Sequence, residues 1–501
     1  MTKSLTDRTL SGVKWNVAKI YGKTLVNIFV GIVLARILPP EDFGLIGMTV
    51  IFTGLADLFA TMGMGASIVK QNDLNNDHIR VATTFTFILG IFVFFVFWIS
   101  APFIADFYNE KRLIEILRVL SIVFIIKGIN TVSYSLIIKK IDFKLILKIE
   151  LSGFVFGYSF ISITFALLGY GVWSLVWGRL ASNIISAIYS LIMVPPTINP
   201  SLKKKEFNEL FSFGAGVSLS KFIHYAATNI DYLIIGKLLS PFSLGLYQRS
   251  YNLMTLPITK VSSGIYNVLF PAFAEVQNNV KKLQSGYLRT LQTVALLLFP
   301  ILTAMAVCGD IIILGLYGPN WVGAIQVFKI LVIAGFFRTT LSYSGAIAHA
   351  TGKIYAEVFQ QIMYVVVLSI GAYLGVRYGI EGVGVAVVIA LLCLFVAQSY
   401  LAIKIIEINW TIFFKSLSPG LIISLIIGLF DFLLVRIINE YLYSIPEPIK
   451  LTIVIALTAI IFLCCIIFLP IKVKGDTINW LFSKYSSKIP KKLIQYYNRY
   501  N

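Results

Sequence analysis

Charged residues are scarce in this chain of 501 residues: 13% are Asp, Glu, Lys or Arg, whereas 58% are hydrophobic. Soluble proteins carry about 25% charged and about 45–50% apolar residues. This shortage of charge excludes a water-soluble globular enzyme and indicates a protein that lies in a lipid bilayer. About fourteen apolar segments of about 25 residues each leave only short connections, so a large water-soluble domain is excluded as well.

Residues with catalytic or metal-binding chemistry are also few. The chain has three histidines and four cysteines. Because no cysteine has metal-ligand spacing to a histidine, we interpret the cysteines as small apolar packing residues. There is no HExxH motif, no GxSxG nucleophile elbow and no P-loop. We therefore expect no catalytic residues, no metal site and no enzymatic activity.

The apolar segments have the length of transmembrane helices. Each is too long for a barrel strand and lacks strict alternation of polar and apolar residues. The sequence therefore predicts an all-α integral membrane protein with about 14 transmembrane helices. We expect them over 14–37, 43–66, 80–104, 114–137, 145–168, 172–194, 208–238, 244–270, 288–315, 323–349, 356–377, 382–405, 413–437 and 450–470.

Lys and Arg are concentrated in every second connection between these segments. Basic connections include 139–148 and 203–205, whereas those at 39–42 and 240–241 hold no Lys or Arg. Because cytoplasmic connections are rich in Lys and Arg, the alternation predicts an even number of spans with both termini cytoplasmic, in a bacterial or archaeal cytoplasmic membrane. The net charge of +19 follows the same pattern, so it indicates membrane topology rather than nucleic-acid binding.

The chain contains an internal repeat. The turn Arg36–Leu45 (RILPPEDFGL) aligns with Lys237–Leu246 (KLLSPFSLGL), 201 positions later (237 − 36), with Pro and Gly in register. Thr131–Ser135 likewise aligns with Thr340–Ser344. A six-helix unit that occurs twice keeps its orientation in the membrane, so we expect two pseudo-symmetric lobes. The predicted domains are an N-lobe over 1–200 (helices 1–6), a C-lobe over 201–408 (helices 7–12), two extra helices over 409–470 and a basic cytoplasmic tail over 471–501.

Charged and polar side chains recur within the predicted helices at helical spacing, as with Lys19, Lys23 and Asn27 on the first helix. A cation near the bilayer centre costs about 2.5–3.5 kcal/mol, and a shared water-filled cavity between the lobes removes most of that cost. The alternative is that the long side chains extend to the lipid headgroups. On the first interpretation, the substrate-binding residues of a central cationic cavity are Lys19, Lys23, Lys127, Arg179, Lys221, His224, Arg249 and Arg338.

Acidic residues are fewer on these helix faces. Asp57 and Asp231 are the only expected acidic partners of the cations, and they either bind a coupling cation or balance the neighbouring charge. Asp310 and Asp431 we interpret as structural or interfacial groups near helix ends. A surplus of positive charge suits an anion, and Arg suits phosphate in particular. We therefore expect a large phosphate-bearing lipid with a polar headgroup as the substrate.

Five short motifs carry a resemblance to a known family. They are Gly12–Trp15 (GVKW), Leu34–Leu45 (LARILPPEDFGL), Asn229–Lys237 (NIDYLIIGK), Gly245–Tyr251 (GLYQRSY) and Tyr317–Trp321 (YGPNW). With these motifs the chain resembles the polysaccharide flippases of the multidrug/oligosaccharidyl-lipid/polysaccharide exporter superfamily, of the colanic-acid and teichuronic-acid exporter type. The resemblance implies two six-helix lobes, alternating access, and transport of an undecaprenyl-diphosphate-linked oligosaccharide from the inner to the outer leaflet.

The same resemblance implies no cofactor and leaves the coupling cation open between Na⁺ and H⁺. The expected partners are the lipid-linked oligosaccharide and membrane lipids, together with a polysaccharide polymerase and glycosyltransferases, and no nucleic acid. Two alternative functions predict other sequence features. A multidrug or cation antiporter of the same fold predicts dominant carboxylates in the cavity. A membrane glycolipid polymerase or ligase predicts a cluster of acids or bases on an outer loop, and the outer connections are short.

Overall fold

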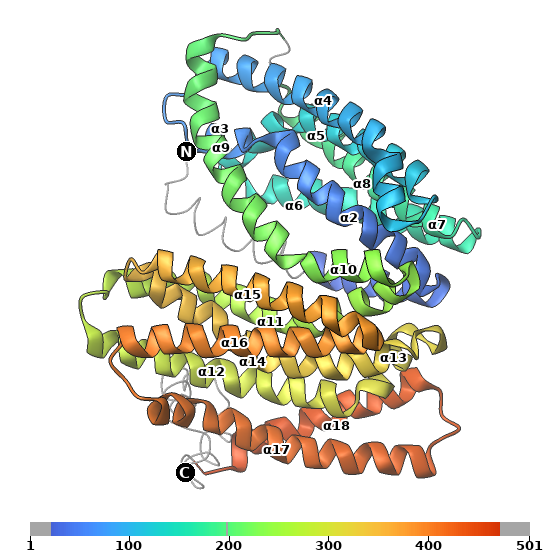
Figure 1. The fold of residues 1–501 in the computed structure, drawn as a ribbon, viewed down its shortest axis with the longest axis vertical. Helices are drawn as coiled ribbons and strands as arrows, with labels where there is room; N and C mark the ends of the chain where they lie inside the picture. Colours follow the sequence, from blue (N-terminus) through green and yellow to red (C-terminus); the bar gives the residue numbers. More distant parts are fainter. Residues whose placement is uncertain (1–21, 197–198, 471–501) are drawn as a thin grey trace. The chain divides into compact units, whose positions relative to one another are not determined.

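The computed structural model describes residues 22–196 and 199–470, apart from some side chains in α9 and α11. These residues form helices joined by short turns, with no strand among them (Figure 1). Nine segments in this part of the chain are long and apolar enough to cross a membrane, and one of them, Ile354–Ile405, contains two helices. The predicted fold class, an all-α integral membrane protein, is confirmed. The number of about fourteen transmembrane helices stays a prediction.

The chain divides into two compact units, Met1–Gly245 and Leu246–Asn501. Our predicted lobes meet after residue 200, whereas the compact units meet after Gly245. The reason is that α9 and α10, at the start of the predicted C-lobe, pack against α2, α3 and α4. The duplication of a six-helix unit stays a prediction from the sequence.

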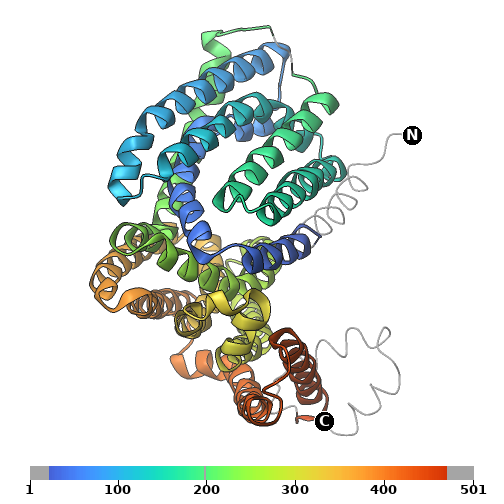
Figure 2. The same cartoon turned by 90° about the vertical axis from the view of Figure 1, so that its right-hand side faces the viewer.

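The helices of each unit follow one another with short connections, and α4 and α5 run side by side (Figures 1 and 2). The first unit contains the helical segment 22–37, α2 (Pro40–Thr61), α3 (Met64–Lys70), α4 (Asn76–Tyr108), α5 (Leu113–Lys139), α6 (Phe143–Ser152), a π-helix (Gly153–Phe160), α7 (Ile161–Leu167), α8 (Val172–Met193), α9 (Lys204–Thr228) and α10 (Ile230–Leu238). The second unit contains most of α11 (Pro241–Glu275), then α12 (Val280–Val307), α13 (Gly309–Tyr317), a 3₁₀ turn (Pro319–Trp321), α14 (Ala324–Ala350), α15 (Ile354–Gly375), a second 3₁₀ turn (Val376–Tyr378), α16 (Gly379–Ile405), α17 (Trp410–Tyr441) and α18 (Glu447–Phe468).

Side-chain caps fix where several helices begin. At the start of α4, the Asn75 side chain accepts a 2.8 Å hydrogen bond from the His78 N–H. At the start of α17, the Asn409 side chain accepts one of 2.9 Å from the Ile412 N–H. Such caps satisfy N–H groups that have no partner in the first turn of a helix. Pro40 begins α2, where the missing N–H of proline costs nothing.

Three of the predicted transmembrane helices are broken in the structure. The segment predicted over 43–66 divides into α2 and α3 at Met62 and Gly63, whose φ angles are 37° and 64°. Asn229 separates α9 from α10, and Cys308 separates α12 from α13. Glycine adopts positive φ readily, so Gly63 is the break with a clear signal in the sequence.

The second unit has a core rich in aromatic side chains. Tyr287 of α12, Tyr343 of α14, Phe395 of α16 and Phe413 of α17 belong to one buried cluster. A buried tyrosine hydroxyl needs a hydrogen-bond partner, and Tyr287 shares a 2.8 Å hydrogen bond with Ser344. The cluster thereby holds α17, which lies outside the predicted repeat, on the helices of the C-lobe.

Large apolar side chains are exposed on the outer faces of many helices. Examples are Ile99 and Phe103 on α4, Phe359 on α15 and Leu425 on α17. Soluble proteins rarely expose contiguous apolar patches of this kind. These faces are suited to contact with lipid chains, as the low charge content predicts.

Two glycines of the repeated motif allow α2 and α11 to cross with no side chain between them. A Cβ atom on Gly44 would lie 1.6 Å from the carbonyl oxygen of Pro241, and one on Gly245 would lie 1.9 Å from that of Pro40. Gly44 and Gly245 are equivalent positions of the repeat, as are Pro40 and Pro241, both pairs 201 residues apart. The contact is therefore symmetric between the two copies of the motif and supports their alignment.

Replacing Gly44 by Ala is expected to destabilise the protein by about 1–3 kcal/mol, because the backbone of α2 must move away from α11. Unfolding of the purified protein in detergent measures the change. The matched control is Gly264→Ala, since a Cβ added to Gly264 of α11 meets nothing within 4 Å. That variant is expected to be neutral or more stable by about 0.5–1 kcal/mol. Equal stability of the two variants would contradict the close crossing.

Candidate functional site

Lys127, Arg179 and Asp57 were predicted from the sequence, and they lie together in the first unit. The Lys127 Nζ atom is 2.5 Å from Asp57 Oδ2. Arg179 lines the same small hollow as Asp57 and Thr53. These side chains come from α2, α5 and α8, which are far apart in the sequence. The fold thus brings two cations to one carboxylate among membrane helices.

Small residues next to the two cations allow their helices to pack closely. Gly128 of α5 faces α4, where the Thr86 hydroxyl donates a 2.8 Å hydrogen bond to the Gly128 carbonyl. Gly178 of α8 faces α7, where an added Cβ would meet Ser162 Oγ at 1.8 Å. These contacts fix the rotation of α5 and α8 about their axes, and with it the side from which the neighbouring cations project.

Tyr225 of α9 belongs to the same group and was not predicted from the sequence. Its hydroxyl donates a 2.8 Å hydrogen bond to the Val50 carbonyl, and the charges of Arg179 and Asp57 both act on it. Gly54 makes room for the ring, since a Cβ there would lie 2.1 Å from the hydroxyl oxygen. A single tyrosine in a chain with 25 of them gives no signal of such a role.

Lys23 has a carboxylate partner that the sequence did not lead us to expect. Its Nζ atom is 2.9 Å from Glu150 Oε2 on α6, and the Tyr134 hydroxyl donates a 2.6 Å hydrogen bond to Glu150 Oε1. The expectation that Asp57 and Asp231 are the only acidic partners is therefore wrong. Three described cations of the first unit now face two carboxylates, which leaves an excess of one positive charge.

The other residues of this unit predicted for the site are Lys19, Lys221, His224 and Asp231. The side chains of Lys19, Lys221 and His224 lie outside the described residues. Asp231 is buried in the first turn of α10, with 3% of its surface exposed. Its proposed part in cation binding or charge balance stays a prediction.

Arg249 and Arg338 lie in the second unit, each beside a tyrosine. The Arg338 guanidinium donates a 2.6 Å hydrogen bond to the Tyr251 hydroxyl, and its central carbon is 5.7 Å from the centre of the Tyr251 ring. The charge of Arg249 acts on the Tyr317 hydroxyl. Protein groups therefore orient the Arg338 side chain, and lipid headgroups are not needed for that. The single cavity expected to unite both groups of cations stays a prediction.

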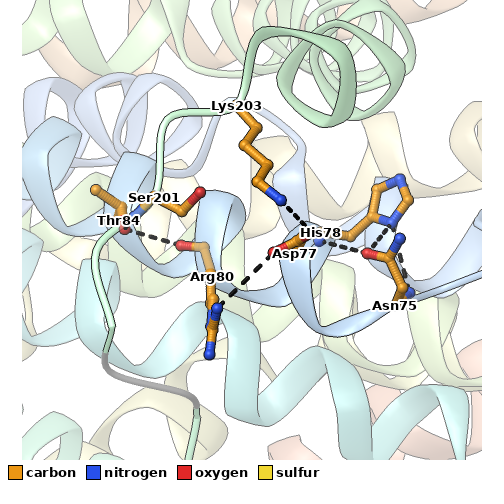
Figure 3. A network of polar contacts seen from close by, with 7 residues as sticks. All are labelled: Asn75, Asp77, His78, Arg80, Thr84, Ser201 and Lys203. Atoms are coloured by element: carbon orange, nitrogen blue, oxygen red, sulfur yellow. Dashed lines mark hydrogen bonds and ion pairs between the residues drawn. The ribbon is translucent and has the colours of Figure 1, made fainter.

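A separate polar network joins the start of α4 to the connection that precedes α9 (Figure 3). Lys203 Nζ lies 2.5 Å from Asp77 Oδ2, and Arg80 reaches the other oxygen of Asp77 at 3.9 Å. The Ser201 N–H donates a 3.0 Å hydrogen bond to the Thr84 hydroxyl. The hydrogen bond to Asp77 raises the pKa of Lys203 above its usual value. This network holds the connection in place and is structural.

His78 lies at the edge of that network with both ring nitrogens engaged. Nδ1 is 2.7 Å from Asn75 Oδ1, and Nε2 is 2.9 Å from Glu209 Oε2. The imidazole therefore has no nitrogen left for a metal ion or a substrate. Across the described ranges, no three His, Cys, Asp or Glu side chains gather as a metal site requires.

Comparison with known proteins identifies the family. Residues 33–326 match the family described as polysaccharide biosynthesis protein, which is more than half of the chain. The chain belongs to the polysaccharide biosynthesis protein family. It is 25% identical over 487 residues to the teichuronic acid biosynthesis protein TuaB of Bacillus subtilis (strain 168), covering 96% of this chain and 99% of TuaB.

Two further comparisons agree with this family. The chain is 27% identical over 392 residues to the lipopolysaccharide biosynthesis protein WzxC of Escherichia coli (strain K12), covering 75% of this chain and 78% of WzxC. Among solved structures, the lipid II flippase MurJ in an inward closed conformation is similar in fold. The TM-score is 0.71 at 16% identity, over 95% of this chain and 100% of that one. This family member therefore has the fold of a membrane transporter.

Loss of Lys127 is expected to leave Asp57 charged without its cation, so Lys127→Ala should destabilise the protein by about 1–3 kcal/mol. The side chains are 33% and 25% exposed, so water screens part of the penalty. In the double variant Lys127→Ala/Asp57→Asn, removal of the orphaned charge should recover part of the loss, with a coupling energy of about 0.5–3 kcal/mol. Unfolding in detergent measures Lys127→Ala, Asp57→Asn and the double variant, and strictly additive effects would contradict the ion pair.

Proposed function

We propose that this protein is a flippase that moves a lipid-linked oligosaccharide, the undecaprenyl-diphosphate-linked repeat unit of a polysaccharide, from the inner to the outer leaflet by alternating access. The family match supports a role in polysaccharide biosynthesis, and a relative of nearly full coverage is named for the biosynthesis of an anionic polymer, teichuronic acid. The fold shared with a lipid II flippase supports transport rather than catalysis.

The observation that carries the proposal is the convergence of Lys127 and Arg179 on Asp57 among membrane helices. A diphosphate carries more negative charge than one carboxylate, and Arg binds phosphate oxygens in a bidentate way. Such a ligand competes with Asp57 for Lys127 and also binds Arg179, whereas a neutral or cationic compound does neither. The excess positive charge therefore favours an anionic lipid over a cationic drug, which argues against the antiporter.

The carboxylates of the site neutralise its lysines when no substrate is bound. Asp57 and Glu150 each pair with a lysine, and an unpaired ammonium within the membrane costs about 2.5–3.5 kcal/mol. Binding of substrate then exchanges one anionic partner for another. After release, the carboxylates take back the lysines, so the empty transporter is not left with unneutralised charge.

The location and the partners follow from the same reaction. The distribution of Lys and Arg supports a cytoplasmic membrane with both termini on the cytoplasmic side. Glycosyltransferases that build the lipid-linked substrate act before the flippase, and a polymerase that joins the repeat units acts after it. These enzymes, the lipid-linked oligosaccharide and the surrounding lipids are the proposed partners, and nucleic acid is not one.

Deletion of the gene in its native host is expected to make one lipid-linked oligosaccharide accumulate on the inner leaflet. Mass spectrometry of extracted lipids detects the accumulation, and an impermeant sugar-modifying reagent reports the leaflet. A plasmid-borne copy of the gene should reverse it. No accumulation, together with a new sensitivity to cationic drugs, would point instead to the antiporter.

The double variant Arg249→Ala/Arg338→Ala is expected to reduce export at least about tenfold, because a hydrogen bond to a charged group contributes about 1.5–3 kcal/mol. Export is measured as surface polysaccharide in the complemented deletion strain, with membrane insertion checked by immunoblot. The control is Arg289→Ala, which removes an exposed arginine of α12 in the same unit. Full export by the double variant would remove these two residues from the site.

A further inference from the structure

A carboxyl group is buried on α17, one of the two helices beyond the predicted repeat. Asp431 is 0% exposed. Its Oδ1 atom accepts a 2.6 Å hydrogen bond from the Thr458 hydroxyl of α18. Its Oδ2 atom is buried and has no hydrogen-bond partner among the described residues. Tyr441 ends α17 ten residues further on, about 15 Å away along the helix. The interfacial position expected from the sequence stays a prediction.

An apolar cavity lies on one side of this carboxyl. It has a volume of about 440 Å³, and its wall includes Thr458, Cys308 and Ile427, the residue one turn before Asp431 on α17. No charged side chain lines it. Nothing on this side neutralises a carboxylate.

A polar pocket also lies close to this stretch of α17. It has a volume of about 690 Å³ and is lined by Asp310, Lys329, Arg436, Asn439 and Glu440. Two apolar neighbours of Asp431 on α17, at positions 432 and 435, also form part of its wall. Residues within one turn of Asp431 therefore line both an apolar cavity and a polar pocket.

Ionisable groups on the surrounding helices do not pair with this carboxyl. Lys329 binds Asp310 at 2.7 Å, and Lys450 binds Glu447 at 2.8 Å. No Lys, Arg or His forms an ion pair with Asp431 within the part of the chain that the structure describes. The charged groups, histidine and thiols on these helices are Lys281, Lys282 and Arg289 early in α12, Cys308 and Asp310 at the α12–α13 break, Lys329, Arg338 and His349 on α14, Lys415, Arg436 and Glu440 on α17, and Glu447, Lys450, Cys464 and Cys465 on α18.

The chemistry of the surroundings identifies what the carboxyl binds. An ionised carboxylate that is buried with one hydrogen bond and no cation is strongly penalised, whereas a carboxylic acid fits the same space. A hard metal cation needs several oxygen ligands. The printed contacts here offer the carboxyl and one hydroxyl. The ligand that suits the site is therefore a proton.

We propose that Asp431 is a proton-binding site between α17 and α18. It holds a proton when the two helices pack as in this structure. When they separate, the O–H bond of the acid breaks, its electron pair stays on the carboxylate, and the proton passes to bulk water that enters through the polar pocket. The binding of a proton stands on its own, while the coupling of its release to lipid transport rests on the proposed function.

Infrared spectroscopy of the full-length protein in lipid vesicles tests the site without any transport. The wild type is expected to show a carboxylic-acid C=O band at neutral pH that is lost in Asp431→Asn. In Thr458→Val the band should persist and move to higher frequency, because the carbonyl loses its hydrogen bond. The control Asp57→Asn should leave the band unchanged, since Asp57 is an ionised partner of Lys127. A wild-type spectrum without an acid band that depends on Asp431 would overturn the proposal.

Transport in vesicles tests the coupling. The probe is fluorescent undecaprenyl-diphosphate-linked N-acetylglucosamine in phosphatidylethanolamine and phosphatidylglycerol vesicles. A pH gradient is expected to accelerate wild-type transport severalfold and to leave the transport rate of Asp431→Asn unchanged. The control Asp73→Asn, an exposed connection residue, should respond as the wild type does. If the wild type transports the lipid at a rate that does not depend on the gradient, the coupling is rejected and the flippase function is retained. If neither the wild type nor any variant transports the lipid, the flippase function is rejected, and the infrared result is unaffected.

Discussion

Several cations within the described helices bind an acceptor from another helix, and these contacts organise the structure. Lys127 of α5 binds Asp57 of α2, and Lys23 of the first described helix binds Glu150 of α6. In the second unit the acceptor is a tyrosine hydroxyl, because Arg338 of α14 donates a hydrogen bond to Tyr251 of α11. These contacts join helices that are distant in the sequence. On the proposed function, a ligand that binds Lys127 displaces Asp57, which favours ligands with concentrated negative charge.

The fold class and part of the site were predictable for separate reasons. Apolar segments of helical length reveal a membrane protein whatever their tertiary packing. Lys127, Arg179 and Asp57 could be found because charge is rare in such segments, so each charged residue is conspicuous. Glu150 was not expected as a partner of Lys23, because it lies next to a basic connection, where a charged residue is not conspicuous. Tyr225 gave no signal, since tyrosine occurs both in apolar helix faces and in binding sites. Tyr251 was noticed only as the last residue of the motif Gly245–Tyr251 and not as a partner of Arg338.

Other features depend on tertiary contacts that leave no local trace. Asn229 interrupts a helix without the glycine or proline that marks a break, whereas Gly309 directly follows the break at Cys308. The segment Gly153–Phe160 is π-helical within an apolar run, and the glycines Gly153 and Gly157 there fit against serines of α8. Asp431 lies near the end of an apolar segment in the sequence, yet its helix extends beyond that segment and α18 covers it. Packing between helices, rather than the composition of any one of them, decides these positions.

The crossing at Gly44 and Gly245 explains why the internal repeat is still visible. Each glycine faces the backbone of the other copy, with Pro241 opposite Gly44 and Pro40 opposite Gly245. After a duplication, the two copies of most segments diverge independently, because each contacts different neighbours. Here each copy is the other's neighbour, so a larger residue in either one disturbs both. On the predicted duplication, mutual constraint of this kind slows divergence at the point where the two copies of the motif touch.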